Sequence, residues 1–411
     1  MNTLRQDAQV IINAALNAAM PDTAVARALE RFRPPGGRLV LVAAGKAAWQ
    51  MAKTACDSLG ERIDCGVVVT KYGHGKAPLP RIKTFEAGHP VPDQNSFAAT
   101  AQAIAAVRNL GADDAVLFLL SGGGSALFES PLIPQPDLEE LTRQLLACGA
   151  DIVEINTLRK RLSAVKGGRF ANICAPARVF SIVLSDILGD PLDMIASGPA
   201  YPDASTCAQA VGIAKKYCLA LTPQMETLLR QETPKQLVNV ETHITGSVRQ
   251  LCAAAETACG ELGYLPTVLT ASLRCTARDA GSFLASIAQY HAGSDRSLAF
   301  IAGGETVVQL TGTGLGGRNQ EIALSAAAEI DALERTAVFS FGSDGTDGPT
   351  DAAGGYCDNT TRLRLREQGI DIPAVLADND AYHALEKCGG LIMTGPTGTN
   401  VNDLSVVLIR R

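Results

Sequence analysis

Short apolar runs, each followed closely by glycine or a polar residue, recur along the whole chain of 411 residues. The runs are continuous rather than alternating in polarity, as expected of strands that are covered on both faces. Helical patterns separate many of them, as in residues 97–110 and 280–290. This alternation predicts an α/β protein with largely parallel sheets. The runs occupy residues 39–43, 67–70, 115–120, 179–184, 267–270, 298–302, 337–341 and 391–393.

The length suggests more than one domain, because a typical domain holds about 100–150 residues. The stretch between Ala220 and His243 is polar, carries two prolines and lacks a strong strand pattern. We expect the boundary there, with an N-terminal domain at residues 1–235 and a C-terminal domain at residues 236–411.

Composition excludes several classes of protein. With 46% hydrophobic and 19% charged residues, the chain is not a disordered one. The net charge of −6 gives no basic surface for nucleic acid, and no apolar run approaches the ~18 residues that a membrane span needs. The 11 cysteines include no CxxC pair, which fits reduced thiols. We expect a cytoplasmic protein with no nucleic-acid or membrane partner, whose residues 10–20 form an amphipathic helix.

Polar residues are concentrated where the predicted strands end, which is where open α/β sheets bind ligands. Three successive glycines after run 115–120 can expose their N–H groups, so this loop is a candidate nest for nucleotide phosphates; a tight turn is the alternative. Lys46 follows run 39–43 at a predicted helix start, a position that favours anions, although a solvated lysine would fit the same pattern. The loop residues are Ser121, Gly122, Gly123, Gly124 and Ser125.

Three carboxylates lie in one glycine-rich run, at Asp344, Asp347 and Asp351. They repel one another unless a divalent cation such as Mg²⁺ or Mn²⁺, or a Lys or Arg, lies nearby. Asp344 and Asp347 are therefore candidate metal ligands. The simpler alternative is a turn whose aspartates cap their own backbone and the next helix.

Residues 155–169 show the pattern of a basic amphipathic helix that ends at Gly167 and Gly168. Lys166 and these two glycines are candidate phosphate ligands, with a solvated basic face as an equal alternative. Further along, Asp186 ends a predicted strand and Asp190 follows four residues later. Asp186 is a candidate catalytic residue and Asp190 a candidate metal ligand, although two turn aspartates would give the same pattern.

A Gly-x-Gly-x-x-Gly spacing over residues 312–317 superficially matches a dinucleotide fingerprint. The match is weak, because the residues about 20 positions further on lie in or just after the following helix, where an acidic side chain could not easily hold a ribose. Arg318 and Asn319, at the start of that helix, fit a phosphate or carboxylate clamp better. Glu305, after two glycines, is a candidate for orienting a substrate hydroxyl or binding metal. The segment 391–404 either lines the same site or forms a plain hairpin turn.

A series of motifs occurs in order over nearly the whole length of the chain: AAGKA, SGGGSAL, an RKxLSAxKGGR-type helix, LSD…GD…ASGP, GGETxV, GxGGRNQE, SDGTDGPTDAAG and TGPTGTNVNDL. In these motifs the chain resembles the glycerate 2-kinases of the MOFRL group. The resemblance implies ATP-dependent phosphorylation of D-glycerate at its 2-hydroxyl. It also implies a Rossmann-like α/β/α N-terminal domain, a smaller α/β MOFRL-type C-terminal domain and an active site in the cleft between them. The family's site lysine falls on Lys46 and its site arginine on Arg318.

Members of this group also carry labels as hydroxypyruvate reductases, so an NAD(P)H-dependent reductase is the alternative. Glycine-rich loops, clustered aspartates and isolated Lys and Arg favour the kinase, because phosphoryl transfer depends on positioning and charge neutralisation. A reductase would need a sound dinucleotide fingerprint and usually a His partner near an Arg. A sugar-phosphate-binding module without turnover would need purely structural aspartates. The expected partners are D-glycerate and ATP with Mg²⁺ or Mn²⁺, and a homodimer is an open alternative to a monomer.

Overall fold

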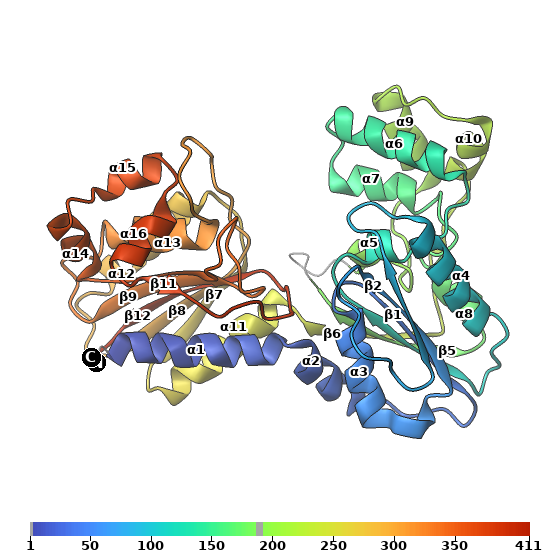
Figure 1. The fold of residues 1–411 in the computed structure, drawn as a ribbon, viewed down its shortest axis with the longest axis horizontal. Coiled ribbons are helices and arrows are strands. Elements are labelled where there is room, and N and C mark those ends of the chain that lie inside the picture. Colours follow the sequence, from blue (N-terminus) through green and yellow to red (C-terminus); the bar gives the residue numbers. More distant parts are fainter. Residues whose placement is uncertain (1–2, 186–191) are drawn as a thin grey trace. The chain divides into compact units, whose positions relative to one another are not determined.

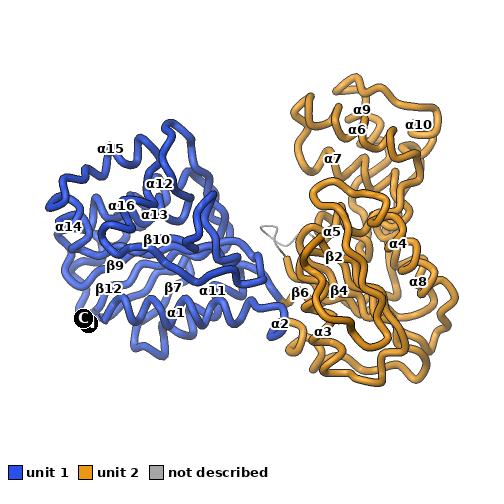
Figure 2. Tube along the Cα trace, viewed as in Figure 1, with its two compact units in different colours: residues 1–23, 186–189, 246–411 blue, residues 24–185, 190–245 orange. Residues whose placement is uncertain are grey.

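The computed structural model describes residues 3–185 and 192–411. They form two compact units, each built on its own six-stranded sheet (Figure 1, Figure 2). Unit 1 holds residues 3–23 and 246–411, and unit 2 holds residues 24–185 and 192–245. Asp186 and Asp190 lie outside the described residues. No helix in the described part is long and apolar enough to cross a membrane.

The sheet of unit 2 has the order β3-β2-β1-β4-β5-β6. Strand β1 is parallel to β2 and β4, β2 is parallel to β3, and β4 is parallel to β5. This confirms the predicted parallel arrangement for the first half of the chain. The strands are β1 (Leu39–Ala44), β2 (Cys65–Lys71), β3 (Ile82–Ala87), β4 (Ala115–Leu120), β5 (Arg178–Leu184) and β6 (Val240–Gly246).

Helices cover both faces of this sheet. Leu117 and Leu119 of β4 pack with the helices α2 and α3, whereas Phe118, which points to the opposite face, contacts Phe170 of α8. Four further helices, α6, α7, α9 and α10, share a separate core around Leu141 and Leu158. The helices of this unit are α2 (Pro21–Leu29), α3 (Ala48–Leu59), η1 (Gly60–Arg62), α4 (Gln94–Val107), α5 (Gly124–Leu127), α6 (Gln135–Ala147), α7 (Ile152–Arg159), α8 (Arg169–Cys174), η2 (Ile195–Ser197), α9 (Cys207–Lys216) and α10 (Pro223–Leu229).

The sheet of unit 1 has the order β11-β10-β9-β12-β8-β7 and is mixed. Strand β12 is antiparallel to both of its neighbours, β8 and β9, and β10 is antiparallel to β9 and β11, while β7 and β8 are parallel. The prediction of a largely parallel sheet is therefore wrong for this unit, because the last segment of the chain runs back between two strands. The strands are β7 (Leu265–Leu273), β8 (Leu298–Gly304), β9 (Thr336–Gly342), β10 (Gly354–Asp358), β11 (Leu391–Ile392) and β12 (Asp403–Ile409).

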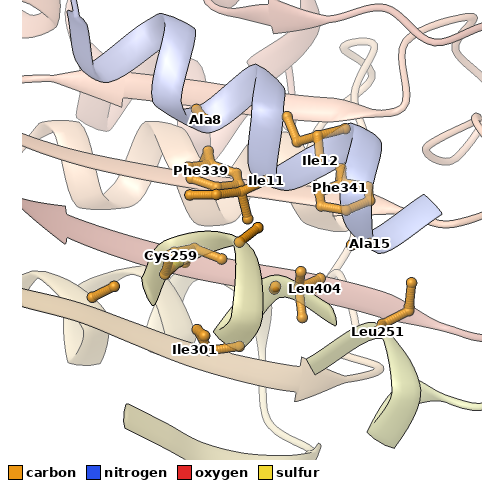
Figure 3. Close-up of a cluster of buried hydrophobic side chains, with 14 of the residues drawn as sticks. Ala8, Ile11, Ile12, Ala15, Leu251, Cys259, Ile301, Phe339, Phe341 and Leu404 are labelled. Carbon is orange, nitrogen blue, oxygen red and sulfur yellow. The ribbon is translucent and has the colours of Figure 1, made fainter. Parts of the chain in front are cut away.

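The N-terminal helix belongs to the same unit as the C-terminal half of the chain. The predicted division at residue 235 placed this helix in the other domain. Helix α1 packs with α11 on one face of the sheet, where Ile11 and Ile12 meet Phe339 and Phe341 (Figure 3). Helices α12, α13 and α16 cover the other face (Figure 1). The helices are α1 (Thr3–Ala19), α11 (Val248–Glu261), α12 (Ala277–Tyr290), α13 (Arg318–Ala327), α14 (Thr361–Glu367), α15 (Ile372–Ala377) and α16 (Ala381–Lys387).

The helix predicted over residues 155–169 ends at Arg159. Beyond it the chain turns, and α8 begins only after Gly168. The two basic residues that follow the end of α7 are buried and bind polar partners. Lys160 Nζ lies 2.9 Å from Asp193 and 3.1 Å from Asp203, and Arg161 donates to the Thr157 and Ser205 carbonyls.

Candidate active site

In unit 2, the predicted phosphate loop and Lys46 lie side by side because β1 and β4 are adjacent parallel strands that end at the same edge. The backbone N–H of Lys46 donates to the Gly122 carbonyl at 2.9 Å, and that of Ala47 donates to Ser121 Oγ at 3.0 Å. Gly45 has φ +128°, and a Cβ there would lie 2.2 Å from Ser121 Oγ. The glycine therefore permits the contact between the two turns.

Four consecutive backbone N–H groups in this loop, those of residues 122–125, donate to no acceptor in the described part of the chain. Gly123 has φ +86°, and a Cβ built on it would lie 3.0 Å from the His89 ring and 3.3 Å from Lys46 Cγ. The loop thus presents free N–H donors between a lysine and a histidine side chain. Such a group of successive amides is the geometry of an anion-binding nest.

His89 is a neighbour of this loop that the sequence analysis did not include in the site. Burial lowers the pKa of its imidazole, and the charges of Lys46 and Lys71 lower it further. The ring is therefore neutral near pH 7 and can accept a hydrogen bond. A signal was present, since His89 follows Gly88 shortly after the end of β3 at Ala87.

Lys166 is fully buried, and its ammonium is bound inside the protein. It donates to the carbonyls of Ser125 at 2.7 Å and Phe128 at 3.1 Å, and it pairs with Glu129 at 3.0 Å. The predicted helix-end glycines are engaged as well, because Gly167 and Gly168 donate their N–H groups to the Ser197 and Gly198 carbonyls. Lys166 thus supports the loop at Ser125, and its ammonium and the two glycine N–H groups all donate to acceptors among the described residues.

In unit 1, a second set of polar side chains gathers where β8 and β9 end and the antiparallel β12 begins. Asp403 is paired with Gly304 of β8 and with Gly342 of β9. Glu305, Asp344 and Asp403 therefore follow or begin three adjacent strands at one edge of the sheet. The sequence analysis had Glu305 and Asp344 but not Asp403, because β12 was not recognised as a strand.

Arg318 begins α13 and binds to this edge. Its Nε and Nη2 donate to the two carboxylate oxygens of Asp403 at 2.5 and 3.0 Å, and Nη1 donates to Glu305 at 3.0 Å. Burial alone would lower the pKa of Arg318, but the hydrogen bonds and charge of Asp403, with the charge of Glu305, raise it above its usual value. The guanidinium is a permanent cation whose side chain is 33% exposed.

Asp347 caps the helix that Arg318 begins. One carboxylate oxygen accepts from the backbone and side-chain N–H groups of Asn319, each at 3.2 Å, and the other accepts from the Gln320 backbone at 2.9 Å. Burial raises the pKa of Asp347 to about 7, even though these donors pull it down. Asn319 is itself buried and accepts from Ser340 Oγ at 2.5 Å. Asp347 thus caps a helix that precedes it in the chain, whereas the simpler alternative had such an aspartate cap its own backbone and the next helix.

Asp344 is the more available carboxylate of the pair predicted as metal ligands. It is half-buried, and one oxygen accepts from the Thr346 backbone at 3.0 Å. A Cβ on Gly342 would lie 3.3 Å from an Asp344 oxygen and 3.4 Å from an Asp403 oxygen, so these two carboxylates flank the same glycine. Within residues 3–185 and 192–411, no group of three or more His, Cys, Asp or Glu side chains is arranged to hold a metal ion.

Two family models match the chain, the "Domain of unknown function (DUF4147)" over residues 7–230 and the "MOFRL family" over residues 298–403. The chain is 49% identical to D-glycerate 2-kinase of Thermotoga maritima over 99% of each chain. It is 42% identical to glycerate 2-kinase of Pyrococcus horikoshii, with 91% of this chain and 88% of the relative covered. The crystal structure of glycerate kinase from Thermotoga maritima matches over 100% of both chains with a TM-score of 0.95 at 49% identity.

The chain belongs to the glycerate 2-kinase family. The membership predicted from the series of motifs is thus confirmed.

Within this glycerate 2-kinase family member, the Gly-x-Gly-x-x-Gly spacing has a structural role. The N–H groups of Thr311 and Gly312 donate to the Asn379 side chain, and that of Gly314 donates to the Asp378 carbonyl at 2.8 Å. A Cβ on Gly312 would lie 2.3 Å from Asp378 Cα. Gly312 and Gly314 allow close packing against residues 378–380, and the amides of these two glycines are not available to a dinucleotide. This agrees with the judgement that the fingerprint is weak.

Proposed function

We propose that the protein transfers the γ-phosphoryl group of ATP to the 2-hydroxyl of D-glycerate and forms 2-phospho-D-glycerate and ADP. The observation that carries this proposal is the set of four free N–H groups at residues 122–125 beside Lys46, in a chain of this family. The cytoplasmic location and the homodimer stay predictions from the sequence.

In this proposal, the loop and Lys46 of unit 2 bind the phosphates. The N–H groups of residues 122–125 donate hydrogen bonds to phosphate oxygens, and Lys46 supplies a full positive charge beside this loop. The oxygen of the 2-hydroxyl forms a bond to the γ-phosphorus, the bond from that phosphorus to the β–γ bridging oxygen breaks, and the hydroxyl proton leaves. Fixed donors suit this chemistry, since it depends mainly on positioning and charge neutralisation.

We propose that Arg318 and Glu305 of unit 1 act on glycerate. Arg318 has five N–H donors and uses three of them on Asp403 and Glu305, so two are left for a carboxylate or a phosphoryl oxygen. Glu305 is 46% exposed and can accept from a substrate hydroxyl. Asn319 and Lys166 are bound inside the protein. We propose that Asn319 positions Arg318 and that Lys166 positions the phosphate loop.

A divalent cation, Mg²⁺ or Mn²⁺, is part of the proposal. Such an ion is usually held by one or two carboxylates together with substrate phosphates, and it would neutralise charge on the transferring group. Asp344 fits this task because it is half-buried and one of its oxygens has no hydrogen bond to a described residue. Asp347 fits it less well, since both of its oxygens cap α13. Asp186, as a catalytic residue, and Asp190, as a ligand, remain proposals from the sequence.

The experiment that tests the function runs two assays on the same enzyme. ADP release is followed with ATP, Mg²⁺ and D-glycerate, and NADH oxidation is followed with hydroxypyruvate. We expect ADP release that requires D-glycerate and no NADH oxidation. NADH oxidation without ADP release would establish the reductase instead, and neither activity would favour a binding module without turnover.

A further inference from the structure

Arg159, the last residue of α7, is a half-buried cation. Its side chain makes no hydrogen bond or ion pair with any described residue. Burial lowers the pKa of Arg159, and the charge of Glu129 only partly offsets this. The next two residues differ, because Lys160 and Arg161 are fully buried but paired with carboxylates. A desolvated charge is costly unless it is paired, so Arg159 needs a different explanation from its neighbours.

One link from α7 to the phosphate loop runs through serine side chains. Asn156 lies one turn before Arg159 on the same side of the helix. Its side-chain oxygen accepts from Ser197 Oγ at 2.9 Å, and Ser197 Oγ lies 3.2 Å from Ser125 Oγ. The face of α7 that carries Arg159 is therefore directed to the C-terminal end of the loop at residues 121–125.

A second link runs through Glu129. Its carboxylate attracts the Arg159 guanidinium and binds Lys166 at 3.0 Å, and Lys166 in turn donates to the Ser125 carbonyl at 2.7 Å. Both links end at the same residue of the loop. Arg159, which has no hydrogen-bond or ion-pair partner among the described residues, thus lies on the helix face that these contacts link to the phosphate loop.

We propose that Arg159 is a binding residue of the active site that pairs with the oxyanion held by residues 121–125, either a nucleotide phosphate or the glycerate carboxylate. This inference rests on the proposed function of the loop. A guanidinium offers two parallel N–H donors that match either oxyanion, so the bound anion would supply the partner that the protein does not.

The test compares Arg159→Gln with wild type and with Arg143→Gln. Arg143 is an exposed arginine that pairs with Glu140 at 2.7 Å on α6, and it serves as the control. Thermal-shift titrations with ATP, with pyrophosphate and with D-glycerate give each dissociation constant, and steady-state assays give KM and kcat. Arg159→Lys shows whether charge alone is enough.

We expect the unliganded Tm of Arg159→Gln to equal or exceed that of wild type, because no pair is lost. We also expect at least one dissociation constant to rise about 10–100-fold, the range for a lost hydrogen bond to a charged group. Weaker binding of ATP and pyrophosphate assigns the phosphate, and weaker binding of D-glycerate alone assigns the carboxylate. Unchanged dissociation constants for all three ligands would overturn the inference, whatever happens to Tm.

The titrations need no turnover, so the two ideas can fail separately. If wild type binds ATP but does not phosphorylate glycerate, the proposed function fails while the result for Arg159 still stands.

Discussion

The guanidinium of Arg318 is bound by two carboxylates and still has donors left, which makes it both a structural and a candidate catalytic group. Asp403 accepts from Nε and Nη2, which lie on one edge of the guanidinium. The position of the Arg318 side chain therefore depends on a planar pair of donors that lysine lacks. Asp347 caps the same helix and so fixes the position of the helix start that carries Arg318. At this scale, the chemistry follows from a few side chains at the start of α13.

Arg318→Lys should lower kcat about 10²–10³-fold, the scale of a lost electrostatic stabiliser of a transition state. Lysine keeps the charge but cannot bind Asp403 and a substrate oxyanion with parallel donors. Steady-state kinetics on glycerate measure the effect, with folding checked by circular dichroism. Arg362→Lys is the control, because Arg362 pairs with Asp331 at 3.0 Å on the surface. Near wild-type kcat/KM in Arg318→Lys would remove Arg318 from the reaction, and a higher KM with kcat retained would limit it to substrate binding.

Asp347→Asn should change how stability depends on pH. The pKa of Asp347 is about 7 in the fold, above the ordinary value of about 3.9 expected for the unfolded chain. A raised pKa contributes stability that is complete below the unfolded value and is lost as pH rises through the folded one. From about pH 5 to about pH 8, the free energy of unfolding of wild type should therefore fall by about 1–3 kcal/mol relative to the variant. Urea unfolding at both pH values checks this, and a difference that does not change with pH would show that the carboxyl is ionised throughout.

At the scale of elements, two glycine-rich segments of similar appearance have opposite roles. The N–H groups of residues 122–125 donate to no acceptor among the described residues, whereas Thr311, Gly312 and Gly314 donate to the segment at residues 378–380. Sequence spacing alone could not separate these cases, because the difference lies in what packs against each loop. Strand-end position was the better guide, since Lys46 and residues 121–125, which it selected, lie side by side in the structure.

Gly123→Ala should weaken ATP binding by about 10-fold or more, because the new methyl would meet His89 and Lys46 within the nest. Gly149→Ala is a matched control, since Gly149 also has positive φ, at +72°, but opens to empty space. Both variants should lose about 1 kcal/mol of stability from the left-handed backbone. ATP titration calorimetry with urea unfolding separates the two effects. Equal ATP affinity in both variants would contradict the nest.

Ser125→Ala should cost less than Gly123→Ala in the same titration. The proposed ligand of the phosphate is the backbone N–H of Ser125, and its hydroxyl is already close to Ser197 Oγ at 3.2 Å. A Ser125→Ala variant that loses more ATP affinity than Gly123→Ala would show that the hydroxyl, and not the backbone, carries the binding.

The elements that the sequence analysis missed explain the site residues that it missed. Seven of the eight apolar runs lie wholly within strands, the eighth, 391–393, extends one residue beyond β11, and the N-terminal helix is present as predicted. Strand β12 was overlooked although all seven of its residues are buried. The antiparallel pairing that brings Asp403 to Arg318 was therefore missed as well. Arg159 was placed inside a longer helix, so its position at the end of α7 could not be anticipated. Such features depend on tertiary partners and not on local pattern.

For the whole molecule, the proposed site residues are shared between the two units, with Lys46 and the phosphate loop in one and Arg318 and Asp344 in the other. The series of motifs predicted the family correctly because it runs through both units. The N-terminal helix shows the limit of that approach, since its amphipathic pattern does not specify which sheet it covers.

If residues of both units serve one reaction, Lys46→Met and Arg318→Lys should not be additive. Residues that stabilise one transition state act as a unit, so the double variant should be about as slow as the slower single variant. Steady-state kcat values of the four enzymes test this. A double variant whose loss equals the product of the two single losses would indicate independent roles.

The position of the phosphoryl group on the product tests the central claim most directly. Wild-type enzyme is incubated with ATP, Mg²⁺ and D-glycerate, and the product is identified by phosphorus–proton correlation in NMR. The proposed function predicts that the phosphorus couples to the proton on carbon 2, as in 2-phospho-D-glycerate, with ADP formed in equal amount. Coupling to the protons on carbon 3, or no phosphorylated glycerate at all, would contradict it.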